Sequence, residues 1–431
     1  MYNALAIEDL GKPVVSLVHP GFLPDARSAA SSRGLPTARI IPLDVPNEGR
    51  IEAEFDAGAI KAMPAIIEGL TKPLTADEKS PKPRDATTPR IAFRGNYEAV
   101  NRFYYRNGWT DGLPIVPPTE EAVAEMLTGT DLPANHVVAK VIPRLGKATV
   151  EKIAINAVMA GALPTHMPVL IAAVQALDDQ RTRFDTFEVS TGSWAPCFII
   201  NGPIRNEIHV NFGSGSLSPG NIANSAIGRA VGLIVKNIGG ARKAIEDMGV
   251  IGNPSKYSLI IGENEEETPW EPLHVERGFK KEDNVVTVFF PNNFLQNVPG
   301  GGDAQGIARS LAGLQPISMS AVIVIPQIAK TLSDGGFTKE SLKRFILENG
   351  ATPARKTQTA DASTVLAAPP RAFNTDELVI LVAGGPGAWA ATLRSVGGIQ
   401  NSFVSKKIEL PRNWEQLVQK YRNVVPVYVE Y

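Results

Sequence analysis

The sequence predicts an α/β protein in which mixed sheets are covered by helices in several layers, with a short N-terminal β-α-β segment docked on a larger body. Three observations predict this class. Strand-sized apolar runs alternate with amphipathic helical segments along the 431 residues. Hydrophobic residues make up 43% of the chain, which is enough for a large core. Turns rich in glycine and proline punctuate the chain where elements would end.

The first 70 residues form the short N-terminal unit. Residues 13–19 predict a buried strand, residues 25–33 predict a helix that stops at Gly34, and residues 38–43 predict a second strand. A β-α-β unit of this size cannot bury a core alone. We therefore expect it to dock on the rest of the chain or on a partner.

Residues 71–93, rich in Pro, Lys, Asp and Thr, predict a linker to the main body over residues 94–431. Residues 352–370 mark either a sub-boundary or a surface loop, and we favour the loop because the apolar run after it needs a sheet. The remaining pattern predicts helices over residues 96–106, 120–127, 150–160, 167–177, 222–237, 304–314, 339–348, 388–394 and 414–421. It predicts strands over residues 184–189, 197–201, 258–261, 285–290, 320–325 and 378–383.

Composition argues against several classes of protein. The formal net charge is −1, so no field attracts nucleic acid or anionic lipid. The first residues lack the basic start and apolar run of a secretory signal, and no apolar stretch reaches the roughly 20 residues of a membrane span. We expect a soluble, cytoplasmic homo-oligomer with no nucleic-acid or membrane partner. The single cysteine, Cys197, excludes an intramolecular disulfide, and its apolar flanks predict burial.

Three glycine-rich turns, at residues 213–220, 300–303 and 384–387, are candidates for binding an anion. Glycine lets the backbone approach a ligand, and the free N–H groups at a helix start favour negative charge. Each turn could equally be a tight connection between packed elements. None carries the Walker or dinucleotide-binding fingerprint, so the sequence gives little support to a nucleotide, and the cofactor stays open, with a divalent metal as one option.

The turn at residues 213–220 is the strongest of the three, because neutral hydrogen-bonding side chains and two arginines surround it. An arginine combined with backbone N–H groups is suited to hold a carboxylate. The alternative is that the polar residues only cap the turn and the helix. The substrate-binding residues expected here are Arg205, Asn211, Ser214, Ser216, Asn221, Asn224 and Arg229.

Residues 262–278 concentrate glutamates around Trp270 and His274. Carboxylates with one imidazole can act as acid and base, or can ligate a divalent metal. A solvated acidic loop is the alternative for residues 265–267. We expect His274 with Glu271 or Glu276 as the catalytic groups and Trp270 as a substrate contact.

A third candidate is the loop at residues 109–114, which prolines stiffen. Asp111 could take part in catalysis and Trp109 could line a pocket. The alternative is an Asp-Gly turn within a proline-braced connection.

Residues 11–46 resemble a known family. They contain Gly11-Lys12-Pro13 before a strand, Phe22, Ala26-Arg27 and Gly34-Leu35-Pro36, a pattern similar to part of the UGSC family, which is named for a selenocysteine-Gly-Ser-Cys motif. The redox-active motif of that family lies upstream of this segment, and no cysteine of this chain matches it. The resemblance therefore carries over no thiol or selenol site, but it implies a UGSC-type partner.

Residues from about 94 onward resemble a bacterial family that occurs with or fused to such proteins. The matching motifs begin at Gly108-Trp109-Thr110-Asp111, at Asn201-Gly202-Pro203, at Ile227-Gly228-Arg229 and at Trp270-Glu271-Pro272. This resemblance supports the architecture and the choice of residues, and it implies no particular reaction.

The leading hypothesis is an enzyme for a small, anionic organic substrate, with a lyase or hydrolase favoured over an oxidoreductase. It requires the turn at residues 213–220, Arg229 and His274 to meet in one cavity. The alternatives are a non-catalytic or binding subunit of a thiol or selenol redox system, and a structural homo-oligomer.

Overall fold

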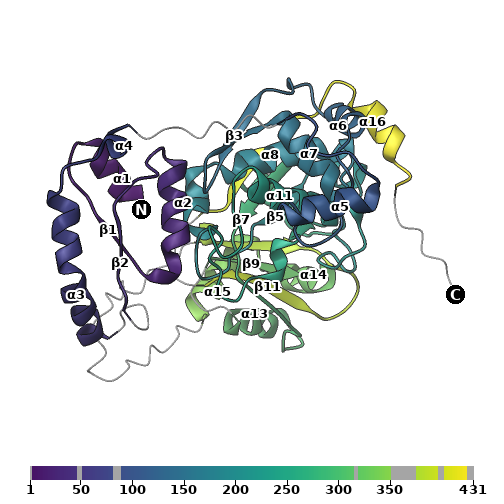
Figure 1. Cartoon of the computed structure of the whole chain (residues 1–431). Coiled ribbons are helices and arrows are strands. Elements are labelled where there is room, and N and C mark those ends of the chain that lie inside the picture. Colours follow the sequence, from purple (N-terminus) through teal and green to yellow (C-terminus); the bar gives the residue numbers. More distant parts are fainter. Residues whose placement is uncertain are drawn as a thin grey trace.

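The computed structural model of the chain describes residues 2–45, 51–80, 89–314, 319–350, 375–396 and 402–424. It confirms the α/β class, because helices cover mixed sheets in the main body (Figure 1). A small N-terminal unit lies beside this body, at the left of Figure 1. Within the described ranges, no helix is both long and apolar enough to cross a bilayer.

The first sheet of the main body has the order β12 (Val404–Lys407), β7 (Val285–Phe289), β5 (Cys197–Asn201) and β6 (Ile260–Gly262). β5 and β6 run parallel, whereas β7 is antiparallel to both β5 and β12. Every residue of β5 is buried, as a strand covered on both faces requires. The outer face packs against α7 (Val150–Ala160), α8 (Met167–Leu177) and α11 (Ile222–Asn237).

The second sheet has the order β10 (Leu378–Val382), β9 (Met319–Val324), β11 (Ala390–Ser395) and β8 (Asn293–Asn297). β9 and β10 run parallel, and β11 is antiparallel to both β9 and β8. Its outer face packs against α13 (Ala304–Gly313), α14 (Pro326–Asp334) and α15 (Lys339–Asn349).

The two sheets face each other across a shared apolar layer. Successive side chains of a strand point to opposite faces. In β5, Phe198 and Ile200 therefore join the core under the first helices, whereas Cys197 and Ile199 join the core between the sheets. The second sheet alternates in the same way, so the body has four layers, with helices outside and two sheets inside. Cys197 is buried, as expected, and burial raises the pKa of its thiol.

The two sheets share one topology. The order β6-β5-β7-β12 corresponds to β10-β9-β11-β8, with matching parallel and antiparallel pairs. The edge strands are exchanged: the chain leaves β7 and adds β8 to the other sheet, and it leaves β11 and adds β12 to the first. The sequence shows no repeat of fixed period because the connections differ in length and the exchange hides the unit.

Helix ends follow side-chain capping. Thr149 accepts the Lys152 N–H at the start of α7, and Gly161, with a φ of 80°, ends it. Asp303 and Thr338 cap α13 and α15 in the same way. The body also contains α5 (Tyr97–Arg106), α6 (Glu120–Leu127), β3 (Val137–Val141), β4 (Gly146–Thr149), α10 (Ile204–Glu207), α12 (Leu273–Glu276) and α16 (Trp414–Tyr421).

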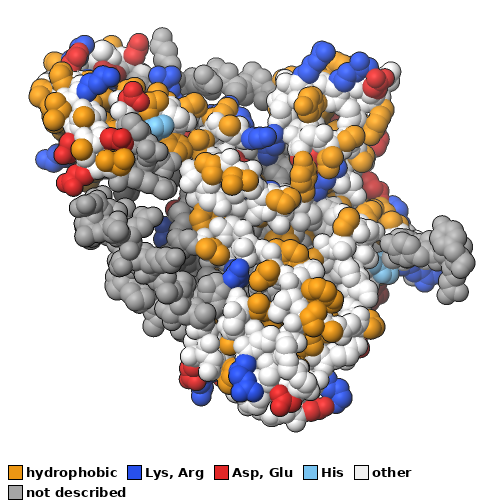
Figure 2. All heavy atoms as spheres, turned by 90° about the horizontal axis from the view of Figure 1, so that it is seen from below, with side chains coloured by type: hydrophobic (Ala, Val, Ile, Leu, Met, Phe, Trp, Pro, Cys, Tyr) orange, Lys and Arg blue, Asp and Glu red, His pale blue; other side chains and the backbone are white. Residues whose placement is uncertain are grey.

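The N-terminal unit is built on two short parallel strands and docks on the body, as expected. Ser28 donates a hydrogen bond to Glu246, which Arg242 also contacts. On its helix α3 (Glu52–Thr71), Ile60, Met63 and Ile67 are exposed. Figure 2 shows apolar atoms spread over the surface of the N-terminal unit. Its elements are α1 (Tyr2–Asp9), β1 (Ser16–Val18), α2 (Leu23–Ser32), β2 (Ile40–Pro42), α3 (Glu52–Thr71) and α4 (Ala76–Lys79).

Two predicted elements are wrong in type. The strand predicted at residues 184–189 is instead the short helix α9 (Phe184–Phe187), because Thr182 accepts the Phe184 N–H and starts a turn. The helix predicted at residues 388–394 is β11, because ladders on both sides override the helical preference of its alanines. Helices α3 and α14 were not predicted. The loop at residues 352–370 lies outside the described residues.

Candidate functional site

A cavity of about 530 Å³ lies between α11 and the segment of residues 243–259 that leads into β6. We call it the α11 cavity. A concave, largely apolar site with a few polar groups is the usual form of a small-molecule site. Its apolar lining includes Pro196, Phe198, Leu233, Val235, Val250 and Leu259. Its charged lining consists of Asp111, Glu188, Arg229, Lys236, Lys243, Asp247 and Lys256.

Asp111 and Arg229 form one edge of this cavity as a two-point ion pair. Arg229 Nε lies 2.7 Å from Asp111 Oδ2, and Nη2 lies 3.0 Å from Oδ1. Nη2 also donates to the carbonyl of Pro114 at 2.8 Å. Nη1 makes no hydrogen bond to a described residue. The pair therefore fixes the loop at residues 109–114 on α11 and leaves one edge of the guanidinium available to a ligand.

Glu188 is a buried acid in the cavity wall. Its nearest cation is Lys256, at 3.7 Å, and Lys256 lies closer to Asp247, at 2.7 Å. Burial raises the pKa of Glu188 to about 7, which Lys256 opposes and Asp247 reinforces. A carboxyl group in a cavity with a pKa near neutrality can both give and accept a proton at physiological pH.

Lys236 lies on the last turn of α11 and also lines the cavity. Its side chain is partly buried, and burial lowers the pKa of its ammonium group, an effect that Asp111 opposes. It has no hydrogen-bond or ion-pair partner among the described residues. Lys236 is thus a partly buried cation that lines the cavity and forms no ion pair with a described carboxylate.

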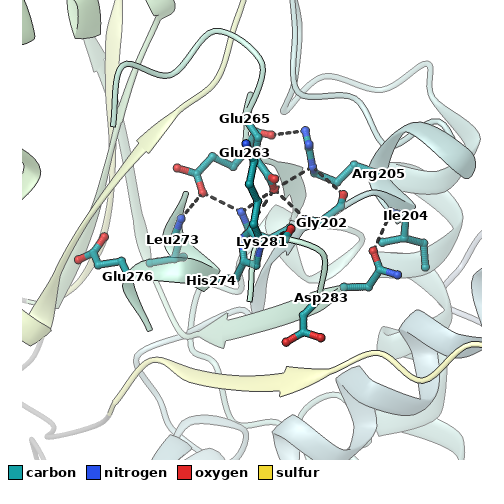
Figure 3. Close-up of polar contacts among 12 residues, drawn as sticks. Gly202, Ile204, Arg205, Glu263, Glu265, Leu273, His274, Glu276, Lys281 and Asp283 are labelled. Atoms are coloured by element: carbon teal, nitrogen blue, oxygen red, sulfur yellow. Dashed lines mark hydrogen bonds and ion pairs between the residues drawn. The ribbon is translucent and has the colours of Figure 1, made fainter. Parts of the chain in front are cut away.

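A second polar centre is a buried ionic cluster at the opposite ends of β5 and β6 (Figure 3). Glu263, fully buried, accepts hydrogen bonds from Asn201 at 2.7 Å, from the Leu273 N–H at 2.7 Å and from Lys339 at 3.0 Å. Lys339 comes from α15, so this contact joins the helices of the second sheet to the strand ends of the first. The carboxylate is fully satisfied by these donors.

Arg205 belongs to the same ionic cluster. Its Nε lies 3.0 Å from Glu265, and its Nη1 donates to the Glu263 carbonyl at 2.5 Å. Glu266 accepts from both Nη1 and Nη2, and the guanidinium lies 4.9 Å from the Phe212 ring. The expected role of Arg205 is substrate binding, and the structure surrounds its guanidinium with groups of the chain itself.

His274 and Glu276 are on α12 beside this cluster. His274 is fully buried, with Nε2 3.2 Å from the Lys281 carbonyl and Nδ1 3.9 Å from Glu265. Glu276 contacts Lys343 and lies 3.7 Å from Lys339. Neither residue lines the α11 cavity. The structure therefore joins His274 to Arg205, through Glu265, but places Arg229 at a separate site.

The turn at residues 213–220 is held by packing rather than left open. Gly384 donates its N–H to the Phe212 carbonyl at 2.8 Å, and a Cβ on Gly385 would lie 1.7 Å from Ser214 Oγ. Two of the three glycine-rich turns therefore pack on each other. Asn224 accepts from the Asn211 N–H at 2.7 Å and donates to the Ile260 carbonyl at 3.2 Å.

A small cavity of about 200 Å³ adjoins this turn, lined by Ser216 and Asn224, and it shares Ser258 with the α11 cavity. Asn221 precedes α11 and makes no side-chain cap. Trp109 packs against Phe103 and Tyr104, and Trp270 donates to the Phe337 carbonyl at 2.9 Å. Glu271 is exposed.

Another cavity, of about 710 Å³, lies between the β3–β4 hairpin and α8. Of its acidic residues, Asp179 is already paired with Arg181 at 2.8 Å and with Lys406 at 3.1 Å. We prefer the smaller α11 cavity because it contains Lys236, which has no partner among the described residues, and an acid that titrates near neutrality.

Sequence reasoning missed Glu188, Lys236 and Lys256. Glu188 lies at the end of a segment taken for a strand, where its burial could not be expected. Lys236 carried a usable signal, because it follows Arg229 by two helical turns and therefore shares its face. In open α/β sheets, ligands usually bind at the carboxyl ends of the strands. Those ends carry the ionic cluster, whereas Pro196 and Leu259, which precede β5 and β6, line the α11 cavity.

No group of three or more His, Cys, Asp or Glu side chains that could hold a metal ion occurs in the described part of the chain. Comparison with protein-family models, with curated proteins and with solved structures gives no match. The site must therefore be interpreted from its own chemistry.

Proposed function

We propose that this protein is an enzyme that acts on a small, anionic organic molecule bound in the α11 cavity, as a lyase or hydrolase that uses acid/base chemistry. The observation that carries the proposal is Glu188, a buried carboxyl group in the cavity wall with a pKa of about 7. Burying an acid whose nearest cation, Lys256, lies closer to Asp247 costs stability, and such a cost is typical of functional sites.

The charge of the cavity supports an anionic substrate. Arg229, Lys236, Lys243 and Lys256 line it against Asp111, Glu188 and Asp247. With Glu188 protonated, the cations exceed the anions. Arg229 Nη1 and the Lys236 ammonium both lack a described partner, so each can bind an oxygen of an anionic ligand.

The chemistry assigned to Glu188 is proton transfer. As the acid it would give a proton to a leaving group, and as the base it would take one from a carbon or from water. The apolar part of the lining lowers the local polarity and so strengthens these electrostatic contacts. The reaction class follows from this proton chemistry and from the absence of a nucleotide-binding fingerprint in the sequence.

The test is a ligand-observed NMR screen of small mono- and dicarboxylic acids against the full chain, followed by turnover assays on each acid that binds. We expect the isosteric change Glu188→Gln to reduce kcat by about 100-fold or more while substrate binding is retained. Wild-type turnover should change with pH around 7, and the variant should lose that dependence. Glu340→Gln, on the exposed side of α15, is the matched control.

The cavity itself can be blocked at its rim. Val250 lines it and is 74% exposed, so Val250→Trp adds bulk at the entrance without disturbing the core. Acids that bind this variant as tightly as the wild type do not occupy the α11 cavity, and such a result would refute the proposal. So would a screen in which no carboxylic acid binds.

His274 remains a catalytic candidate from sequence. Its ring is fully buried and lines none of the three cavities described, so we expect His274→Ala to lower stability and to leave kcat within about threefold of the wild type once folding is confirmed. If His274→Ala reduced kcat as much as Glu188→Gln is expected to, the catalytic site would lie in the ionic cluster instead.

The alternatives, a binding subunit of a redox system and a structural homo-oligomer, receive no specific support. The exposed apolar side chains of α3 are compatible with both and select neither.

A further inference from the structure

Lys236 combines two properties that no other cation of the α11 cavity combines: it is partly buried and it has no ion-pair partner among the described residues. Arg229 is paired with Asp111, Lys256 is paired with Asp247, and Lys243 is exposed to solvent. Lys236 is partly buried, lines the cavity and has no hydrogen-bond or ion-pair partner among the described residues. A lysine in such a place loses hydration of its ammonium group, and no ion pair compensates for that loss.

The surroundings of Lys236 suit a nucleophile. Burial lowers the pKa of its ammonium, which increases the neutral amine fraction at a given pH, although Asp111 limits the effect. Leu233, one turn earlier, and Val235 provide apolar lining, and Gly232 contributes no side chain. Desolvation in an apolar pocket is one of the ways in which proteins activate lysine amines toward carbonyl carbons.

A carboxylate site lies on the same helix face. Arg229 precedes Lys236 by two helical turns, so both side chains reach the same side of α11. Arg229 Nη1 makes no hydrogen bond to a described residue, while Nε and Nη2 are held by Asp111. One helix face therefore offers an oriented guanidinium edge for an anion and an amine for a second functional group.

We propose that Lys236 forms a covalent imine with the carbonyl carbon of a small oxo acid whose carboxylate is held by Arg229. This inference rests on the proposed function and names its substrate class. In the step, the nitrogen of the neutral Lys236 amine bonds to the carbonyl carbon, the C=O π electron pair moves to oxygen, and one N–H proton is transferred to that oxygen. The resulting carbinolamine loses its hydroxyl group as water, as the nitrogen lone pair forms the C=N bond.

Glu188 is suited to the proton movements of this step. It lines the same cavity, and with a pKa of about 7 it can protonate the departing hydroxyl group and then be reprotonated from solvent. The imine draws electrons from the neighbouring carbon, so a carbon–carbon bond or a carbon–hydrogen bond beside it breaks more readily. This is lyase chemistry without an added redox partner.

The experiment is reductive trapping on the full chain. Pyruvate and succinic semialdehyde, which place the carbonyl at different distances from the carboxylate, are incubated separately with the protein and sodium cyanoborohydride. We expect one adduct per chain, with a mass increase equal to that of the neutral acid less one oxygen atom. Peptide mapping should place it on Lys236. Lys330→Met, at an exposed lysine of α14, should label like the wild type.

Lys236→Arg is the decisive variant, because it retains the positive charge and removes the nucleophile. It should bind the unreduced acid within about threefold of the wild-type affinity and should lose at least 90% of the trapped adduct, because arginine is not a nucleophile at neutral pH. Labelling spread over exposed lysines, or equal labelling of this variant, would overturn the inference.

The outcomes separate this inference from the proposed function. Oxo acids that bind the wild type but not Val250→Trp, and that leave no adduct on Lys236, would refute the imine and leave the acid/base enzyme standing. If neither binding nor an adduct is found with any carboxylic acid, both ideas fail.

Discussion

The two sheets of the body share one strand order. They differ in the segment that follows their parallel edge strand, which is β6 in the first sheet and β10 in the second. After β6 the chain runs through residues 263–284, which carry Glu263, Glu265 and His274 and the short helix α12. After β10 it needs only residues 383–389, a glycine-rich turn, to reach β11. The topology is repeated, whereas the α11 cavity and the carboxylates of the ionic cluster belong to the first sheet, and the second sheet's helix α15 contributes only lysines to that cluster. Similar scaffolding therefore does not imply similar chemistry, because function depends on the inserted connections.

We call the first sheet with its helices the first half of the body, and the second sheet with its helices the second half. The largest expected effect on stability concerns the contact between these two halves. Lys339, from the second half, is the only cation within 4 Å of the Glu263 carboxylate in the described part of the chain. Lys339→Met leaves that buried carboxylate without it, and we expect the free energy of unfolding to fall by about 3–5 kcal/mol.

Urea denaturation of the wild type, Lys339→Met and the double variant Glu263→Gln/Lys339→Met measures this effect. The double variant should recover part of the loss, because the buried charge is gone. If the single and double variants are equally unstable, the cost comes from packing and not from the unpaired carboxylate.

A smaller effect is expected where the glycine-rich turn of the second half meets the first half. Gly385→Ala would place a Cβ 1.7 Å from Ser214 Oγ, so one backbone must move. We expect a loss of about 1–3 kcal/mol, measured by thermal or urea unfolding.

Ser214→Gly is the matched partner change. Combined with Gly385→Ala, it should restore most of the stability, whereas Gly300→Ala, where a Cβ meets nothing within 4 Å, should cost less than the clash does. Independent, additive losses in the double variant would show that the two turns do not pack as described.

The smallest effect tests the N-terminal unit, which docks on the first half at Glu246. Burial, and then the Glu246 carboxylate, raise the pKa of Asp25 from 3.8 to about 6. Between these values the folded state holds a proton that the unfolded state has lost, so stability falls as the pH rises from about 4 to 6.

Asp25→Asn should remove this dependence. At pH 8 we expect the variant to be more stable than the wild type by about 1–2 kcal/mol, since the group is only partly buried, and to lose its advantage near pH 4. Differential scanning calorimetry across this range checks the prediction. An advantage that persists at pH 4 would show that charge is not the cause.

Elements with strong local signals could be predicted from sequence. α7, α8, α11 and α16 begin and end where the apolar periodicity predicts, and the Thr149 side chain caps the start of α7. β11 could not be predicted, because its alanines favour a helix and only pairing with β8 and β9 makes them a strand. The exchanged edge strands were also hidden, since pairing across the body leaves no local signal.

The candidate site was only partly predictable. Asp111 and Arg229 were identified by residue type, and both line the α11 cavity. Glu188 was not identified, because an acid gains a raised pKa from burial, and burial is decided by distant segments. Arg205 and His274 were singled out for chemistry, and the structure places them in a cluster whose polar groups mostly satisfy one another. Residue type alone does not separate a charge that awaits a ligand from one that already has a partner.

The exchange of edge strands has a consequence for dissecting the molecule. Because β8 completes the second sheet and β12 completes the first, a cut between β8 and β9 leaves each fragment lacking an outer strand that the other fragment holds. The two fragments would be complementary halves of a split protein, each unfit to be studied alone yet able to reassemble when mixed.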